Sequence, residues 1–488
     1  MRKRFWQRFR WHFLAILSLL VLGIVARPIA TLIPLVLGYK AKEVAAFVFV
    51  ANQSEETAIA LVEEDDPSLR LVTVKVDYER KQVHASLFGV VKRTATFDPS
   101  FGTFLVLPEN EPLKPKPSAN RAPLSGTTNT IPTLPTPEPL NQALVRAFAE
   151  PSPVVSASNI ARDERRTRAI LVFQNDHLIA ERYADGFSAT TRFCGWSMTK
   201  SVMGLLAMMR VDEGALELTS KPKHASWRSI KNDPRNKITL AHFMQMTSGL
   251  AFTEDYSPTC DAVAMLYGQS DMARYALDKP LVAPEAVGRL WQYSSGSANI
   301  VSRMFRNSFQ GHLSDHLNYP KERLFHPLGM TSALFEIDGS GTFVGSSFLF
   351  ATARDWLQVG RLVLNKGYWN GQQLISEHAL TFLFSKPEKS FPQHRYGALW
   401  WLNVPYSEAS SDRWMTGVPA DALIASGHFG QALVIIPSQN LVIVRLGLSK
   451  GATWSLEAFL PSLLAALPPS VSSADTINLQ KSKLDKRP

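Results

Sequence analysis

Two pairs of short apolar runs, each interrupted by polar residues, predict β-hairpins in the second half of the chain. The first pair covers 168–173 and 178–183 and encloses the polar stretch QNDH. The second pair covers 432–436 and 441–446 and encloses PSQN. Turn-forming residues between two β-prone runs reverse the chain direction, so each pair predicts two neighbouring antiparallel strands.

A helical pattern lies between these hairpins. From about 196 to 212, Val202, Leu205, Leu206 and Met209 follow the i, i+3, i+4, i+7 spacing, and Gly214 ends the pattern. Strands at both ends of a region with helices between them predict one antiparallel sheet built from both ends and flanked by helices. We therefore expect an α+β fold.

The first forty residues follow a different pattern, a basic head before two apolar runs. Residues 1–10 hold five basic residues and no acid, and the apolar runs cover 13–26 and 29–38 around Arg27 and Pro28. The pattern predicts an export segment with the rest of the chain outside the cytoplasm. The first run alone spans about 21 Å as a helix against about 30 Å of hydrocarbon. We expect an uncleaved inner-membrane anchor, kinked at the proline, in preference to secretion after signal cleavage or a buried core helix.

Composition divides the chain into five parts. After the anchor or signal (1–39) comes a small β-rich module (40–107), and then a segment (108–140) in which nine residues from 108 to 139 are proline, as in extended linkers. A large domain (141–468) and a basic tail (469–488) follow. The strand candidates in the module are the runs at 46–50, 71–77 and 83–88.

Charge and cysteine content exclude several classes of protein. The net charge of +10 is concentrated at the ends, because 1–10 contributes +5 and 471–488 contributes +2. A basic face on a folded domain is therefore not indicated, and we expect no nucleic-acid partner. Cys194 and Cys260 cannot form a disulfide framework or a four-ligand zinc site, and we expect two separate thiols in preference to one disulfide.

The helix near 197 begins with a pattern that could carry chemistry. Ser197 and Lys200 lie three residues apart, so they share one face of the helix and the amine can reach the hydroxyl. A serine becomes a useful nucleophile when a base takes its proton, and a lysine buried on an apolar helix can supply that base. The alternative interpretation of Ser197 is a structural helix cap.

Two later segments favour the chemical interpretation. Trp291-Gln292-Tyr293 leads into a Ser/Gly-rich turn, which can present a tyrosine to a cleft. Residues 426–431, SGHFGQ, come directly before a predicted strand, where glycines permit a ligand to approach the strand edge.

In this order, Ser-x-x-Lys at 197–200, Tyr-Ser-x at 293–295 and His-x-Gly at 428–430 resemble the motifs of the penicillin-recognising serine hydrolases. The chain looks most like the class C β-lactamase-related branch that includes 6-aminohexanoate-dimer hydrolases and family VIII esterases. Longer phrases that carry the resemblance are GWSMTKS at 195–201, QMTSGL at 245–250 and HPLGM at 326–330.

The resemblance covers about residues 150–465 and implies a β-lactamase/penicillin-binding-protein-like fold with a helical subdomain. It implies that Ser197 forms the acyl-enzyme, Lys200 is its base and Tyr293 passes a proton to the leaving group. The backbone N–H groups of Ser197 and Gln431 would form the oxyanion hole. Substrate contacts are expected from the residues His428, Gly430, Ser295 and Trp291.

Two positions depart from the β-lactamase pattern. Ser295 stands where those enzymes have Asn, and His428 stands where many relatives have Lys. A serine is too short to replace an amide that reaches the substrate, and an imidazole is not a permanent cation at neutral pH. Both departures disfavour a β-lactam substrate.

Other candidates are weaker. His312 and His316 are spaced like zinc ligands on a helix, but Leu313 stands where a zinc protease needs Glu, so an exposed helix face is expected. No metal or cofactor is expected. Aromatic residues proposed as pocket walls are Trp196, Tyr256, Trp291 and Trp400.

We therefore expect an extracytoplasmic serine hydrolase that cleaves a small amide or ester. The alternatives are a D-Ala peptidase or β-lactamase, and a non-catalytic, membrane-anchored scaffold with the same fold.

Overall fold

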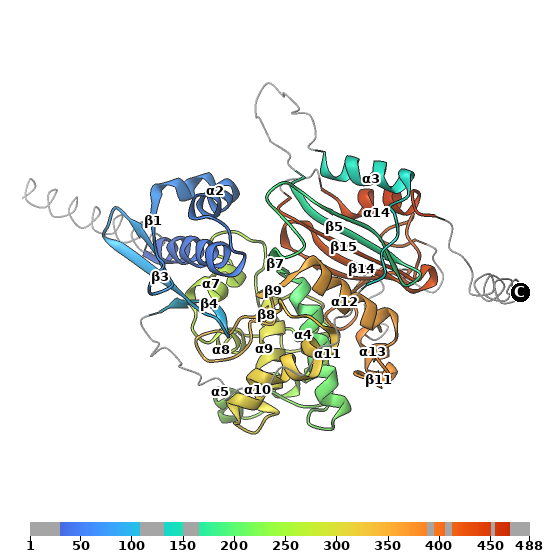
Figure 1. Cartoon of the computed structure of the whole chain (residues 1–488). Coiled ribbons are helices and arrows are strands. Elements are labelled where there is room, and N and C mark those ends of the chain that lie inside the picture. The colour runs from blue at the N-terminus through green and yellow to red at the C-terminus, as the bar shows by residue number, and fades with distance from the viewer. Residues whose placement is uncertain are drawn as a thin grey trace, which may run out of the picture. The chain divides into compact units, whose positions relative to one another are not determined.

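The computed structural model describes residues 30–107, 131–149, 165–387, 395–405, 412–449 and 454–468 (Figure 1). The chain forms two compact units. Among the described residues, the first comprises 30–99 and 103–107 together with the distant segment Thr253–Ser270, and the second comprises the rest.

Most of the predicted membrane anchor, residues 1–29, lies outside the described residues. Residues 30–45 form a helix in the first unit, where Leu35 and Leu37 are buried. Within the part of the chain that the structure describes, no helix combines the length and the apolar character needed to cross a membrane. The anchor stays a prediction.

The first unit contains a four-stranded antiparallel sheet in sequence order. Its strands are β1 (Val72–Asp77), β2 (Gln82–Leu87), β3 (Val91–Asp98) and β4 (Gly102–Val106). The predicted strands at 71–77 and 83–88 are confirmed. The strand predicted at 46–50 is wrong: Ala46–Val50 is a π-helix that continues helix 30–45. A short apolar run fits a buried helix as well as a buried strand, and here the preceding helix decides.

Two buried polar side chains hold the first unit together. Lys40 is 1% exposed, and its Nζ donates to Glu63 Oε1 at 2.7 Å and to two backbone carbonyls near the start of β1. Tyr267 lies in α7 (Asp261–Gly268), and its hydroxyl donates to Glu43 Oε1 at 2.9 Å. This second bond joins the N-terminal helix to a segment more than two hundred residues away in sequence.

The second unit is built on a six-stranded antiparallel sheet in the order β12-β13-β14-β15-β5-β6. Both predicted hairpins are confirmed, and β15 pairs with β5, so the sheet joins the two ends of the domain as expected. The strands are β5 (Thr167–Gln174), β6 (His177–Tyr183), β12 (Trp401–Leu402), β13 (Leu423–Gly427), β14 (Gln431–Ile436) and β15 (Leu441–Gly447).

Helices cover the two faces of this sheet (Figure 1). Alternate strand residues such as Ile170, Val172 and Val434 form a core with α3 (Glu138–Phe148) and α14 (Leu456–Leu464). The helix α12 (Ala353–Leu364) packs against β5, β14 and β15. It comes so close at Gly360 that an added Cβ would lie 2.9 Å from Leu433 Cδ1.

The remaining helices of the second unit form a subdomain around α4 (Met198–Asp212), the predicted helix. α4 contacts α9 (Ser295–Asn307), α13 (Glu377–Leu383) and β13. A small sheet, β7 (Arg192–Cys194), β9 (Leu349–Thr352) and β8 (Leu334–Phe335), leads directly into α4. The other described helices of this region are α5 (Ala225–Ser229), α6 (Leu240–Met244), α8 (Met272–Leu277), α10 (Leu313–Pro320) and α11 (His326–Leu328).

Candidate active site

Ser197 lies in a sharp turn between β7 and α4. Trp196 has φ 48°, which bends the chain into the left-handed region, and Gly195 packs so tightly on the Trp356 ring that no side chain fits there. Ser197 occupies the N-cap position of α4, yet its side chain makes no capping hydrogen bond. The hydroxyl is therefore not used as a structural helix cap.

Lys200 brings the serine into a hydrogen-bonded cluster. The lysine side chain is 1% exposed, and its Nζ lies 2.8 Å from Ser197 Oγ, 3.0 Å from Ser295 Oγ and 3.0 Å from the carbonyl oxygen of Ser346. A neutral amine has two N–H donors and one lone pair. It can donate to Ser295 and Ser346 while its lone pair accepts the Ser197 proton, so the geometry suits a general base.

Tyr293 lies beside the same amine. Lys200 Nζ is 4.9 Å from the centroid of the tyrosine ring, and the ring is held between Trp401 (5.6 Å, stacked) and Tyr396 (5.8 Å, perpendicular). The next residue, Ser294, caps α9 by accepting a hydrogen bond from the Ser297 N–H at 3.0 Å. This cap fixes the start of α9, which places Ser295 against Lys200.

The turn at His428–Gly430 lies against the residues that precede Ser197. The rings of His428 and Phe429 lie 5.6 and 5.9 Å from the Trp196 ring. At the end of β13, a Cβ added to Gly427 would overlap the carbonyl oxygen of Gly195. The sheet edge thus meets the start of α4 at the predicted oxyanion region.

Two buried side chains hold that turn in place. Gln431 Nε2 donates to the carbonyls of His428 (3.1 Å) and Gly447 (2.6 Å), and Oε1 accepts from the Gly447 N–H (2.9 Å). Arg445 is fully buried, donates to the carbonyls of Phe429 and Gly430, and stacks on Trp454 at 3.8 Å. The Gln431 side chain is therefore occupied within the fold, which leaves its backbone N–H as the candidate substrate contact.

The aromatic wall differs in part from the prediction. Trp291 contacts Tyr396 and Trp401 at 5.8 and 6.3 Å between ring centroids. Trp400 is 0% exposed, so its proposed place in the pocket wall is wrong. Successive residues of an extended segment point to opposite sides, and it is Trp401 that stacks on Tyr293. Tyr256 belongs to the first unit.

The remaining candidate side chains lie elsewhere. His316, predicted on an exposed helix face, is instead completely buried against Phe305, Phe309 and Phe343. Burial lowers the pKa of His316 to about 3, with a smaller contribution from the nearby Arg306 charge. Cys194 and Cys260 are both thiols and form no disulfide, as expected.

Several contributors to the site were missed from the sequence. Ser346, Tyr396, Trp401 and Arg445 come from segments without a recognisable motif. Arg445 had one detectable signal, a charged residue inside an otherwise apolar strand, because a buried arginine needs a set of acceptors around it.

A serine hydroxyl at a helix start, a buried lysine one turn later, a tyrosine beside that lysine and a turn at a sheet edge thus lie together in the second unit. The β-lactamase family model matches residues 143–454. The chain belongs to this family and is a serine hydrolase with the β-lactamase/penicillin-binding-protein fold.

Individual relatives agree with this assignment. The chain is 23% identical over 309 residues to the 6-aminohexanoate-dimer hydrolase of Paenarthrobacter ureafaciens, covering 58% of this chain and 73% of that protein. A Bacillus anthracis structure provisionally named as a 6-aminohexanoate-dimer hydrolase superposes with a TM-score of 0.51 at 21% identity, covering 74% and 89%. A structure from Bacteroides dorei, provisionally named as a β-lactamase, superposes with a TM-score of 0.50 at 16% identity, covering 67% and 96%.

Proposed function

We propose that this protein hydrolyses a small amide or ester outside the cytoplasm, through an acyl-enzyme on Ser197. The observation that carries the proposal is the 2.8 Å contact between Lys200 Nζ and Ser197 Oγ in a cluster that also contains Tyr293 and Ser295. The basic and apolar N-terminal pattern supports the location.

In the first step Ser197 Oγ attacks the substrate carbonyl carbon and Lys200 Nζ takes its proton. The carbonyl oxygen becomes an oxyanion, which the N–H groups of Ser197 and Gln431 stabilise. The N–H groups of Met198, Thr199 and Lys200 donate to the carbonyls of the residues three positions before them. The Ser197 N–H is not one of these donors.

The tetrahedral intermediate then collapses. The bond to the leaving amine or alcohol breaks as Tyr293 relays a proton from Lys200 to it, which leaves the acyl group on Ser197. Water then attacks the acyl carbon as one of its protons passes through Tyr293 to Lys200. The bond between the acyl carbon and Ser197 Oγ breaks, Lys200 returns the proton to Oγ, and the acid leaves. No other group is consumed.

The substrate class follows from the residues around the nucleophile. The Ser295 hydroxyl accepts a hydrogen bond from Lys200, and a serine has no side-chain amide that could reach a substrate. The His428 ring packs on Trp196. Linear esters and amides require only the nucleophile, its base and the oxyanion hole. The name of the Paenarthrobacter relative supports an amide.

The test is a substrate panel with the purified full chain: short acyl esters, the linear 6-aminohexanoate dimer and a chromogenic cephalosporin. We expect turnover of a linear ester or amide, and kcat/KM for the cephalosporin at least ~100-fold lower, about 2.7 kcal/mol in transition-state binding. Ser197→Ala is the control for each activity. Cephalosporin hydrolysis as efficient as that of the best linear substrate would restore the β-lactamase alternative.

A further inference from the structure

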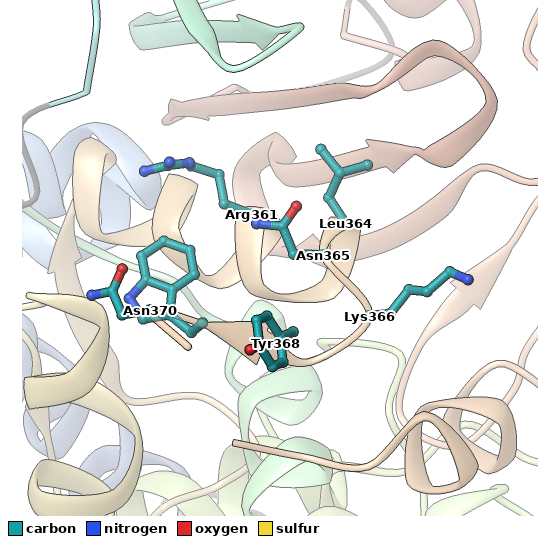
Figure 2. Close-up of a pocket in the computed structure, with 7 residues that line it drawn as sticks. Arg361, Leu364, Asn365, Lys366, Tyr368 and Asn370 are labelled. Carbon is teal, nitrogen blue, oxygen red and sulfur yellow. The ribbon is translucent and has the colours of Figure 1, made fainter. Parts of the chain in front are cut away.

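A pocket of about 620 Å³ lies at the end of α12 and in the hairpin that follows, and seven of the residues from 361 to 370 line it (Figure 2). It shares no lining residue with the Ser197 cluster. Its volume falls within the range of about 300–1,000 Å³ that is typical of sites for small molecules.

The backbone around this pocket is held in a defined conformation. The strands β10 (Tyr368–Trp369) and β11 (Gln372–Gln373) pair across a two-residue turn in which Asn370 has φ 44° and Gly371 has φ 82°. Two successive positive φ angles at an Asn-Gly pair are typical of a type I′ hairpin. The lining side chains therefore project from a tight hairpin and a helix end.

Two lining residues carry buried hydrogen-bond donors without acceptors among the described residues. These donors are Arg361 Nε and Trp369 Nε1. The guanidinium lies between the rings of Phe173 (4.7 Å) and Trp369 (5.0 Å), and its Nη1 donates to Gln358 Oε1 at 2.8 Å. Both atoms have almost no accessible surface, so a ligand in the pocket does not reach them. Arg361 as a residue is only partly buried, so the pocket offers a ligand the accessible part of that side chain and its charge.

The charge of the lining selects the kind of ligand. Arg361 and Lys366 are both cationic, and none of the lining residues is an acid. The exposed Lys366 amine lies 3.7 Å from Glu377. The Lys366 side chain points away from Arg361 (Figure 2). Burial lowers the pKa of the Arg361 guanidinium, and the charge of Asp176 opposes this effect. The described surroundings thus leave Arg361 as the main cation for a bound anion.

We propose that this pocket binds an organic anion, a carboxylate or phosphate attached to a planar or apolar body. The oxyanion pairs with the Arg361 guanidinium, and the body packs on the exposed ring of Tyr368, beside the largely buried Trp369. A lone inorganic ion would leave most of the volume empty, which is why an organic body is part of the proposal.

Calorimetric titration of the full-length Ser197→Ala protein with benzoate, phenyl phosphate and benzamide tests this. The alanine prevents turnover, and benzamide matches benzoate in shape but carries no charge. We expect saturable binding of at least one anion and at least about tenfold weaker binding of benzamide. A preference for either anion supports the proposal and identifies the oxyanion. Benzamide binding as tight as that of the better-bound anion, or no anion binding up to about 10 mM, would overturn it.

A charge variant shows whether binding occurs at this pocket. Asn370→Asp adds a negative charge to the exposed turn, and Asp tolerates the left-handed backbone that Asn adopts there. We expect at least about fivefold weaker anion binding, with benzamide unchanged. The matched control is Asn232→Asp, at another exposed left-handed asparagine (φ 60°) outside the lining. Equal effects of the two variants would contradict the location.

Discussion

Gly427 is the last residue of β13 and comes directly before the His428 turn. Its close approach to Gly195 sets the distance between this sheet edge and Ser197, the proposed nucleophile. The Gly427 backbone is extended (φ −130°, ψ 160°), so alanine meets no conformational penalty there. An added Cβ, however, would overlap the carbonyl oxygen of Gly195 and lie 3.1 Å from Gln431 Cβ. Real Cβ contacts do not fall below 3.0 Å, so the turn or the segment before Ser197 must move.

The size of the effect follows from that movement. A displacement on the order of 1 Å between the nucleophile and its oxyanion donors costs roughly 10² in rate. The overpacked methyl also costs about 1–3 kcal/mol of folding stability. For Gly427→Ala we therefore expect a roughly 100-fold loss in kcat/KM with the fold retained.

The assay is ester or amide hydrolysis measured beside thermal unfolding, with Ser426→Ala on the same strand as control. Gly427→Ala with native stability and kcat/KM within about twofold of the parent would refute the reasoning. That result would mean that the turn and the serine are not coupled through the Gly195 contact.

Three other variants test separate parts of the structure. Lys200→Ala removes the base, and we expect roughly 10²–10⁴ slower acylation in single-turnover kinetics; a loss under tenfold would move the base role to Tyr293. Arg445→Met removes the side-chain donor to the Phe429 and Gly430 carbonyls, although the Ser449 N–H still donates to Phe429, so kcat should fall more than KM rises in steady-state assays, whereas unchanged kcat would refute a positioning role. The pKa of His316 is lowered to about 3 in the folded state. Between pH 6.5 and 3 the unfolded chain therefore binds a proton that the folded chain does not, so the free energy of unfolding falls as the pH falls. In denaturant titrations at pH 5 and pH 6, His316→Leu should reduce this pH dependence by up to about 1.4 kcal/mol per pH unit, and parallel curves would contradict the assignment.

Local patterns were sufficient to predict the elements that position the site. Both hairpins of the main sheet and α4 have strong periodicity and clear turn residues, so their prediction needs no distant information. The Ser197 and Lys200 contact follows from helical spacing alone, and the structure places Nζ and Oγ 2.8 Å apart.

What the sequence could not predict depends on contacts between distant residues. The association of Thr253–Ser270 with the N-terminal unit rests on pairs such as Glu43 and Tyr267. Trp400 and Trp401 have the same side chain, and only the face of the segment decides which one lies at Tyr293. The burial of His316 likewise depends on aromatic residues from two other segments, Phe305 and Phe309 at the end of α9 and Phe343.

The most direct test of the central claim is covalent labelling of the nucleophile. The full chain is treated with a serine-reactive aryl phosphonate and analysed by intact-mass and peptide mass spectrometry, beside Ser197→Ala. The account predicts one adduct, on the peptide that contains Ser197, with hydrolysis lost in proportion to labelling and no adduct on the variant. Labelling of the Ser197→Ala protein at the parent's rate, or full hydrolysis by that protein, would contradict an acyl-enzyme on Ser197.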